Sequence, residues 1–470
     1  MVPHRIGRRS LPAFLSLFAW LTAAALLAGG CSSDSGATPS ADRTEKSNAS
    51  APADSAAGAT MACPDGATDR LALPEGFCAT VYHEGVGPAR HLAVRPNGDV
   101  YVKLSEVTDG GGIVALRDTD GDGTPDRTAR FGDFGGTGVA VRDGHLYASS
   151  NTAVMRWPLP EGNSLVPGSE PQTIVGGFPE QDQHAAKSFT LDGQGGLYVN
   201  VGAPSNACQQ ESRTPGSPGQ DPCPLLEEHG GIWKYDANQT GQAHRPAARY
   251  ASGIRNAVAL DWNAASSAPG DGQLQVAQHG RDQLHSLWPD RYTQKESAQL
   301  PSEELFTVSQ GDDFGWPYCY HDWQQGQKEL APEYGGSGQK VGRCSNFGTP
   351  VAAFPGHWAP NDLLVYGGST FPEKYQGGAF VAFHGSWNRA PYPQQGYRVA
   401  FVPFEQGQPT RGAPSESFST FANGFAGKDT LESPRQAEYR PMGLAQGPDG
   451  ALYITESNDG RIWRVTHPAQ

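Results

Sequence analysis

A histidine, three arginines and an asparagine stand at equivalent places in a repeated pattern, and together they could bind and act on an anion. Arg90, His184, Arg255, Asn256 and Arg440 each precede or begin a run of alternating apolar residues. A guanidinium pairs bidentately with a carboxylate or phosphate, and a histidine, with a pKa of about 6.5, can take up a proton near neutral pH. If these runs meet at one end of the fold, the side chains predict a pocket for a multiply anionic ligand. The alternative is that they are ordinary strand-entry residues in solvated loops.

The repeated pattern is a β-hairpin: an apolar strand, a reversal rich in glycine, and a second alternating strand. Clear copies are the stretch from His184, RHLAVRPNGDVYV from Arg90, GVAVRDGHLYAS from Gly138 and RPMGLAQGPDGALYIT from Arg440, with looser copies from Arg255 and Asp362. Hairpin repeats of roughly 40–50 residues must stack on one another to bury both faces. The six copies therefore predict an all-β fold, a six-bladed β-propeller with insertions between blades. In that fold the strand-entry residues converge on one end of the central channel.

The composition supports this fold class and limits the partners. The 470 residues include 60 glycines and 38 prolines, only 18% are charged, and the formal net charge is −14. Abundant turn residues with few charges argue against a helical bundle or a coiled coil. The acidic balance argues against nucleic acid as a partner.

The first residues form a targeting segment. Arg5, Arg8 and Arg9 precede an apolar run that ends in LLAGGC, with Cys31 as the cysteine. This pattern predicts a signal peptide of the lipoprotein type over residues 1–30, with Cys31 as the lipidated first residue of the mature protein. We expect an exported cell-envelope lipoprotein, on the periplasmic side of the outer membrane in a Gram-negative cell, held by its lipid anchor alone. An ordinary signal peptide or an uncleaved anchor is the alternative.

The cysteines and the composition set the domain limits. Residues 31–62 are dominated by Ser, Ala, Asp, Gly and Thr without an apolar period, which predicts a disordered tether. The propeller domain is expected over residues 63–470. Six further cysteines allow fifteen connectivities, but in an exported protein their three neighbouring pairs favour 63–78, 208–223 and 319–344. The sequence contains no CxxCH, so no c-type haem is expected, and no CxxC pair that would suggest zinc.

A second group of chemistry-bearing residues lies in DTDGDGTPD. Its carboxylates are Asp118, Asp120, Asp122 and Asp126. Alternating carboxylates with glycine in a sharp turn supply the oxygen ligands that Ca²⁺ prefers. Ala129 stands where an EF-hand has its twelfth-position Glu, so we expect a structural calcium site in a propeller loop. The alternative is an acidic turn without a metal.

Beyond single residues, the chain resembles the soluble glucose/sorbosone dehydrogenases, which are six-bladed propellers that bind pyrroloquinoline quinone (PQQ) through a calcium ion. The resemblance runs from about residue 73 to 465 and is carried by ARHLAVRPNGDVYV, SGIRNAVALDW, QHGRDQ, GDDFGWPYC, FHGSWNR and YRPMGLAQGPDGALYITESNDG. The sorbosone dehydrogenase-like branch is the most similar, because FGWPYC and HGSWNR are typical of it.

The resemblance implies roles for individual residues. His184 is expected to be the general base, and Arg255 to stabilise charge on the quinone oxygens beside Asn256. Arg90 and Arg440 are expected to hold PQQ carboxylates, and the backbone carbonyls of Gly280 and Arg281 to bind the catalytic Ca²⁺. In HGSWNR the residue that contacts the cofactor is left open between His384, Trp387 and Arg389. Lys187 stands where this branch has arginine.

The favoured interpretation is therefore a PQQ- and Ca²⁺-dependent dehydrogenase that oxidises an aldose or related sugar to a lactone or acid. Without a haem motif it would pass electrons to an external acceptor, a quinone or a cytochrome. One rival is a calcium-dependent propeller lactonase, which needs side-chain carboxylates at its metal. A non-catalytic propeller that binds sugar or protein on the cell envelope is the other. The sequence identifies neither the sugar nor the oligomeric state.

Overall fold

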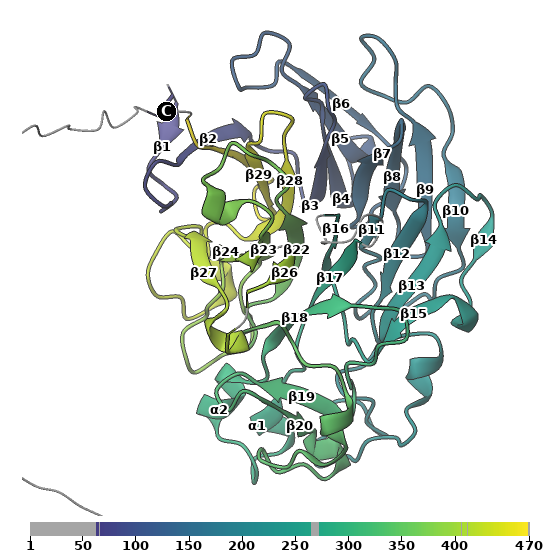
Figure 1. Ribbon diagram of the computed structural model, residues 1–470, viewed down its shortest axis with the longest axis vertical. Coiled ribbons are helices and arrows are strands. Elements are labelled where there is room, and N and C mark those ends of the chain that lie inside the picture. The colour runs from purple at the N-terminus through teal and green to yellow at the C-terminus, as the bar shows by residue number, and fades with distance from the viewer. Residues whose placement is uncertain (1–62, 65, 265–271, 406, 411, 469–470) are drawn as a thin grey trace, which may run out of the picture. The chain divides into compact units, whose positions relative to one another are not determined.

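The computed structural model describes residues 63–468, apart from 65, 265–271, 406 and 411 (Figure 1). The predicted signal peptide, lipidation site and tether lie outside the described residues. No helix in the described part of the chain has the length and apolar character needed to cross a membrane.

The described residues form six β-sheets of four or five strands, antiparallel except for one outer strand, which are the blades of the predicted propeller. Blade 1 is β3 (Ala89–Val94), β4 (Val100–Thr108), β5 (Gly111–Arg117) and β6 (Arg127–Phe131). Blade 2 is β7 (Val139–Arg142), β8 (His145–Ser149), β9 (Ala153–Pro158) and β10 (Gln172–Gly176), with β14 (Gln242–Ala243) parallel to β10 at its outer edge. Blade 3 is β11 (Phe189–Leu191), β12 (Gly196–Val201), β13 (Gly231–Asp236) and β15 (Arg249–Ser252).

The remaining blades follow the same order. Blade 4 is β16 (Ala259–Asn263), β17 (Gln273–Gln278), β18 (Glu303–Val308) and β21 (Ala352–Phe354). Blade 5 is β22 (Pro360–Val365), β23 (Ala379–Phe383), β24 (Arg398–Val402) and β27 (Ser419–Ala422). Blade 6 is β28 (Pro441–Gln446), β29 (Leu452–Glu456) and β30 (Ile462–Thr466), with β2 (Cys78–His83) and β1 (Ala67–Thr68) as its outer strands.

The blades close into a ring. The innermost strands β3, β7, β11, β16, β22 and β28 each contact the next one, and β28 contacts β3. The N-terminal strand β2 pairs with the C-terminal strand β30, from Cys78 opposite Thr466 to His83 opposite Ile462, so the two ends of the domain share blade 6. In Figure 1 the purple β2 accordingly lies beside yellow strands. The predicted six-bladed propeller is confirmed.

The repeat forms hairpins for the reason that its sequence indicates. In the blade 1 hairpin Gly98 has φ 92°, and in the equivalent turn of blade 6 Gly450 has φ 80°. These are left-handed conformations that favour glycine. The alternating apolar residues then pack between neighbouring blades, as in the aromatic cluster of Phe77, Phe371 and Phe421 between blades 5 and 6.

Two insertions extend from blades 3 and 4. Residues 202–230 of blade 3 are closed by the disulfide Cys208–Cys223. The blade 4 insertion has two parts, residues 279–302 before β18 and residues 309–351 after it, and Cys319–Cys344 closes the second part. With Cys63–Cys78 these are the three predicted disulfides, and all three are confirmed. The second insertion contains α1 (Leu284–Leu287), α2 (Gln294–Gln299), β19 (Cys319–Asp322) and β20 (Gln327–Leu330). The other short elements are the hairpin β25 (Phe404–Glu405) and β26 (Gln408–Pro409) and the 3₁₀ turns Pro224–Glu227, Pro246–Ala248, Pro332–Tyr334, Gly342–Asn346, Glu373–Tyr375, Pro414–Glu416 and Pro434–Gln436.

Candidate active site

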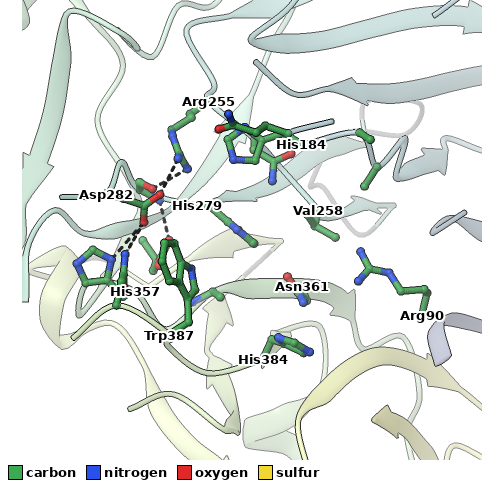
Figure 2. A pocket seen from close by; sticks show the side chains of 18 of the residues that line it. Arg90, His184, Arg255, Val258, His279, Asp282, His357, Asn361, His384 and Trp387 are labelled. Atoms are coloured by element: carbon green, nitrogen blue, oxygen red, sulfur yellow. Dashed lines mark hydrogen bonds and ion pairs between the residues drawn. The ribbon is translucent and has the colours of Figure 1, made fainter. Parts of the chain in front are cut away.

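A cavity of about 440 Å³ lies at the end of the central channel where the innermost strands begin (Figure 2). Because the strands of a blade are antiparallel, the ends of the second strands reach the same level, and they contribute residues that no strand-entry pattern predicts. The lining residues are Arg90, Gln183, His184, Ala185, Ala186, Arg213, Arg255, Asn256, Val258, His279, Gly280, Asp282, Glu303, His357, Ala359, Asn361, His384, Trp387 and Asn388. The structure thus brings together seven residues predicted from the sequence, namely Arg90, His184, Arg255, Asn256, Gly280, His384 and Trp387.

His184 is held in one orientation. Its Nδ1 lies 2.5 Å from the carbonyl oxygen of Ala203. Since a carbonyl oxygen only accepts, Nδ1 carries the hydrogen and Nε2 keeps its lone pair. Burial, followed by the nearby Arg255 guanidinium, lowers the pKa of His184 to about 3. The imidazole is therefore neutral at working pH, which is the state that a proton acceptor requires.

The backbone around His184 is tightly fitted. A Cβ built on Gly202 would lie 2.6 Å from Asn256 Oδ1 and 2.7 Å from the His184 Cβ, so this position needs glycine. Asn200 donates from Nδ2 to Asn256 and accepts at Oδ1 from the amide of Ala257 at 3.0 Å. The strand end of blade 3 and the strand start of blade 4 are thereby tied together beside the histidine.

Arg255 and Asp282 form the central ion pair of the cavity. Arg255 Nη2 lies 3.0 Å from Asp282 Oδ2 and 3.1 Å from Asn206 Oδ1, while Nη1 donates to the backbone oxygen of Gly280 at 2.9 Å. Asp282 also accepts from Asn388 at 2.7 Å. Burial alone would raise the pKa of Asp282, but Arg255 and His357 outweigh it and lower the pKa to about 2.

Arg90 carries a charge that is balanced only in part. Its Nε donates to Thr137 Oγ1 at 3.2 Å, and among the described residues no acidic side chain forms an ion pair with its guanidinium. Burial lowers the pKa of Arg90 to about 10, partly offset by Asp362, so it stays cationic at neutral pH. In Figure 2 it lies across the cavity from the Arg255–Asp282 pair.

Glu303 contributes a buried carboxyl group to the cavity wall. Its Oε2 accepts from the amide of Gly280 at 2.8 Å and its Oε1 from the amide of Ala359 at 3.2 Å. Burial raises the pKa of Glu303 to about 8, although both amides act in the opposite direction. At pH 7 this carboxyl group is mostly protonated, so the cavity has three arginines, Arg90, Arg213 and Arg255, against one ionised carboxylate.

Three more histidines line the cavity, and sequence reasoning missed His279 and His357. His279 Nε2 lies 2.8 Å from Pro360 O, His357 Nε2 lies 2.8 Å from Ser297 O, and His384 Nε2 lies 2.7 Å from Ser457 Oγ. Burial lowers the pKa of each, that of His279 to about 4. The sequence signal for His279 and Asp282 is the QHGRDQ motif. Only Gly280 and Arg281, which lie between them, are predicted there as site residues.

Strained backbone gathers at the cavity. Nine described residues other than glycine have positive φ, and four of them line it: His184 at 55°, Arg213 at 53°, His357 at 69° and Ala359 at 61°. Such conformations are uncommon in residues with a Cβ and cluster at functional sites. This is an indication of function that is independent of the charges.

Three predicted ligand residues are not brought to the cavity. Arg281 does not line the cavity, and its side chain is buried in an ion pair with Glu333; the role predicted for its backbone carbonyl group stays a prediction. Arg389 donates to the backbone oxygens of Pro393, Gly356 and Ala298, and it is buried. Arg440 donates to the oxygens of His384 at 3.0 Å and Gly385 at 2.9 Å, and thus supports the HGSWNR segment from behind. In this segment it is His384 and Trp387 that line the cavity, and the Trp387 side chain is 57% exposed.

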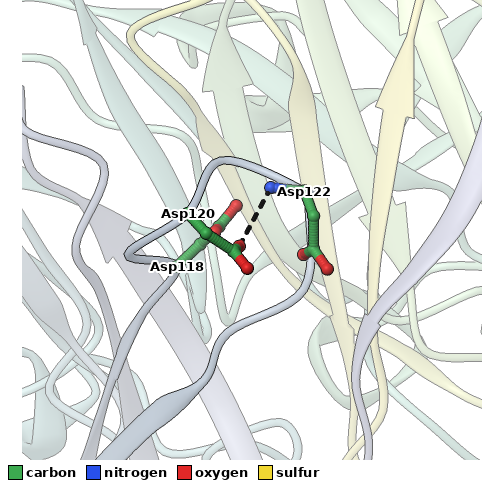
Figure 3. Close-up of side chains that lie close together, drawn as sticks. All are labelled: Asp118, Asp120 and Asp122. Carbon is green, nitrogen blue, oxygen red and sulfur yellow. Dashed lines mark hydrogen bonds between the residues drawn. The ribbon is translucent and has the colours of Figure 1, made fainter.

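The acidic loop, residues 118–126, connects β5 and β6 of blade 1. The carboxylates of Asp118, Asp120 and Asp122 have ligand oxygens within 4.8 Å of one another (Figure 3). Asp118 also accepts from the amides of Gly121 and Gly123, at 2.7 and 2.8 Å. These bonds outweigh burial and lower the pKa of Asp118. Asp126 is not part of this cluster and accepts instead from the Thr119 hydroxyl group.

The fold and the site define a class: a six-bladed propeller with a cation-rich cavity at one end of its channel and an oriented neutral histidine beside it. A family model described as TrAA12-like matches residues 71–468. The chain therefore belongs to the TrAA12-like family, and the predicted resemblance to the soluble PQQ-dependent sugar dehydrogenases is confirmed.

The chain is similar to two proteins whose names include PQQ and to one that has no assigned function. A "Pyrroloquinoline quinone-dependent sugar dehydrogenase" of Hypocrea jecorina is 22% identical over 355 residues, which are 71% of this chain and 74% of that protein. An uncharacterized protein of Borreliella burgdorferi is 24% identical over 216 residues, 46% of this chain, and the match spans about half of that protein, 48%. The holo form of the PQQ domain of a pyranose dehydrogenase from Coprinopsis cinerea has the same fold, with a TM-score of 0.66, 19% identity and coverage of 84% of this chain and 97% of that one.

Proposed function

We propose that this protein is a PQQ-dependent sugar dehydrogenase, which oxidises an aldose or related sugar to a lactone or acid and passes the electrons to an external acceptor. The observation that carries the proposal is the oriented His184, with Nδ1 bound to Ala203 O and Nε2 unprotonated, in a cavity surrounded by arginines. The names of the relatives from Hypocrea jecorina and Coprinopsis cinerea support the same chemistry.

The residues present fit PQQ, which carries three carboxylate groups. Arg90, Arg213 and Arg255 face one ionised carboxylate, Asp282, so the cavity has a surplus of positive charge. Guanidinium–carboxylate pairs are strong because the hydrogen bonds are charge-assisted and bidentate. When bound, PQQ would supply an electron-poor quinone that accepts the hydrogen of the sugar carbon together with two electrons.

His184 then has a defined task. Its Nε2 lone pair takes the proton of the sugar hydroxyl group as the carbon is oxidised, while Nδ1 stays bonded to Ala203 O. An anionic ligand beside Arg255 offsets part of the positive charge that lowers the pKa of His184. Ligand binding therefore makes His184 a stronger base than it is in the free protein.

Calcium is proposed at two places. The Asp118, Asp120 and Asp122 carboxylates offer the hard oxygen ligands of a structural ion. At the cavity, the backbone oxygen of Gly280 is a candidate ligand for a second ion, but it accepts a hydrogen bond from Arg255. An ion there would have to displace the guanidinium from that oxygen.

The strand-entry positions offer arginines rather than the carboxylates that a lactonase metal needs, yet the cavity does contain Asp282 and Glu303. Neither is an open metal ligand. Asp282 is bonded by Arg255 and Asn388, and Glu303 by two backbone amides with a pKa raised to about 8. The carboxylates therefore do not favour a hydrolytic metal centre over the dehydrogenase.

Export and a lipid anchor at Cys31 complete the proposal. The support is the LLAGGC segment, which lies outside the described residues. Cys31→Ala should release the protein from membranes into soluble extracts. Absence of labelled fatty acid from the wild type would overturn this part alone.

The test of the activity uses the purified protein reconstituted with PQQ and Ca²⁺. Reduction of an electron-accepting dye should depend on both PQQ and a sugar, across a panel of aldoses and aldehydes. A wild-type protein that holds no PQQ at micromolar concentration would leave the non-catalytic propeller as the function.

A further inference from the structure

Gln181, three residues before His184, makes an unusual set of contacts. The side-chain nitrogen of Gln181, Nε2, lies 2.7 Å from Gln183 O, 3.0 Å from His184 O and 2.9 Å from Gly202 O. The oxygen of the same amide group, Oε1, is buried and has no hydrogen-bond partner among the described residues. The amide thus acts only as a donor, and it does so to backbone oxygens from two separate segments.

These two segments are the ones that fix the imidazole. His184 O belongs to the residue that carries the ring, in a strained conformation with φ 55°. Gly202 directly precedes Ala203, whose oxygen receives the Nδ1 hydrogen. Gln181 therefore joins the segment that holds the ring to the segment that holds its acceptor.

The side chains of the neighbouring residues do not join these two segments. Lys187 Nζ donates to Ala185 O at 2.7 Å, which secures the chain after the histidine. Gln183 accepts at Oε1 from Arg213, so its side chain is directed toward the insertion of blade 3. Among the described residues, only Gln181 has a side chain that bonds both the His184 and the Gly202 oxygens.

We propose that Gln181 is a positioning residue for His184: by donating to the His184 and Gly202 oxygens it holds the Nδ1–H···O=C bond to Ala203 and so directs Nε2 into the cavity. The catalytic consequence rests on the proposed function, whereas the orientation of the ring does not. Gln181 touches neither the cavity nor a ligand, so its effect passes through His184.

The test variant is Gln181→Glu, which keeps the shape and replaces the donor. An ionised carboxylate would face three carbonyl oxygens, so the pKa of the new side chain rises and its protonated form can donate one bond. We expect kcat to fall roughly ten- to hundredfold at pH 8, the range for a small displacement of a reacting group. KM for the sugar should stay within about twofold of wild type, since the variant removes no group that lines the cavity.

The pH profile separates positioning from general damage. The ratio of variant to wild-type kcat should recover several-fold between pH 8 and pH 5, as the new carboxyl group becomes protonated. The charged groups around this segment, Glu180, Asp182, Lys187, Arg213 and Arg255, are common to both proteins, so their direct effects cancel in the ratio, whereas the state of His184 is what the variant changes. The control is Gln172→Glu, the same change in charge on strand β10, where the amide accepts from Arg156 at 3.3 Å.

A second readout needs neither PQQ nor sugar. In ¹⁵N-histidine-labelled free protein, the wild type should show His184 as the Nδ1–H tautomer, assigned by comparison with His184→Gln. Gln181→Glu at pH 8 should lose this signal or mix it with the Nε2–H tautomer. Gln181→Met, which removes the donor without adding a charge, should do the same at every pH.

The outcomes are distinct. If wild type oxidises no sugar but the tautomer changes as expected, the proposed function fails and the positioning role stands. If both Gln181 variants keep the wild-type tautomer, or if activity is retained at every pH, the positioning role is overturned. If neither variant folds, as judged by circular dichroism, the amide is a folding element of the segment and the positioning role is equally overturned.

Discussion

Arg255 donates from Nη1 to the backbone oxygen of Gly280 at 2.9 Å, so the carbonyl group predicted to bind a calcium ion faces a guanidinium. A Ca²⁺ ion bound to this oxygen would lie close to the guanidinium, and the two positive charges would repel each other. Binding of an ion at Gly280 is therefore coupled to where Arg255 points, and an anionic ligand that attracts Arg255 would free the oxygen.

This relationship predicts opposite effects of one substitution on two ligands. Arg255→Met should weaken PQQ binding roughly tenfold or more, because it removes a charge-assisted partner. In the absence of PQQ it should not weaken Ca²⁺ binding at the cavity and is expected to strengthen it. Calorimetric titration measures both affinities, in an Asp120→Asn background that removes the acidic loop as a competing site. A Ca²⁺ affinity that falls with Arg255→Met would mean that Arg255 does not compete for Gly280.

The sequence predicts the cavity residues that belong to the repeated hairpins. It does not predict those that lie in the insertions between strands. Arg90, His184 and Arg255 were found because each stands near the start of an innermost strand, and a closed ring of blades brings those starts together. Arg213 was missed because it lies in the insertion closed by Cys208–Cys223, whose path no periodicity encodes.

Side-chain direction was the other limit. Arg389 and Arg440 stand at plausible positions, yet their guanidinium groups bond backbone oxygens, and these partners exist only in the folded chain. Glu303 begins β18 after a long insertion, so its proximity to Gly280 could not be predicted. The repeat thus specifies the fold and the cavity residues at the strand starts. The insertions specify many of the charged groups in the cavity.

Arg90 should be needed by the ligand but not by the fold. Burial disfavours its charge and lowers its pKa to about 10, and Asp362 offsets this only in part. Arg90→Met should leave the Tm of the free protein unchanged or higher while raising the Kd for PQQ about ten- to hundredfold. Differential scanning fluorimetry and PQQ titration check the two effects.

Arg255→Met is the matched comparison for stability. It leaves Asp282 buried without its partner at 3.0 Å, and breaking such a pair costs about 3 kcal/mol. The free protein should therefore be destabilised by this change and not by Arg90→Met. Equal loss of stability in both variants would contradict an unbalanced charge at Arg90.

Glu303 should make the free protein less stable as the pH rises. Its pKa is about 8 in the folded protein against an ordinary value of 4.5, so the folded state binds more protons than the unfolded state between these values. Stability from this group is fully present below pH 4.5 and is lost as the pH rises through about 8. Glu303→Gln should flatten the dependence of Tm on pH between pH 6 and pH 9.

Asp282 provides the contrast, because its pKa is lowered to about 2. Its contribution to the stability of the folded protein is therefore lost only in acid, as the pH falls through that value. Asp282→Asn should reduce the slope between pH 6 and pH 9 only in part, because the Asp282 charge is a smaller cause of the raised pKa of Glu303 than burial. If Glu303→Gln keeps the full slope, another group is responsible for it.

His184 should be required for turnover and not for ligand retention. His184→Ala should lower kcat by about two to four orders of magnitude, the usual contribution of a positioned base, while PQQ absorbance in the reconstituted protein is kept. His145→Ala, at the turn between β7 and β8, is the control and should behave as wild type. Turnover near the wild-type rate in His184→Ala would make the histidine a structural residue.

The insertion of blade 3 should act on the ligand through Arg213. This guanidinium contacts Asp282 at 3.5 Å and is 28% exposed, so water screens its charge and Arg213→Gln should weaken PQQ binding only about two- to fivefold.

The Cys208→Ser, Cys223→Ser variant frees the loop that presents Arg213 and should weaken PQQ binding to a similar extent. Combining the two changes should add little, because both remove the same contact. Titrations of the four proteins with PQQ form the cycle, with Arg70→Gln, in an exposed pair with Glu438 outside the insertion, as the control. Fully additive losses would show that the disulfide stabilises the cavity by a route other than Arg213.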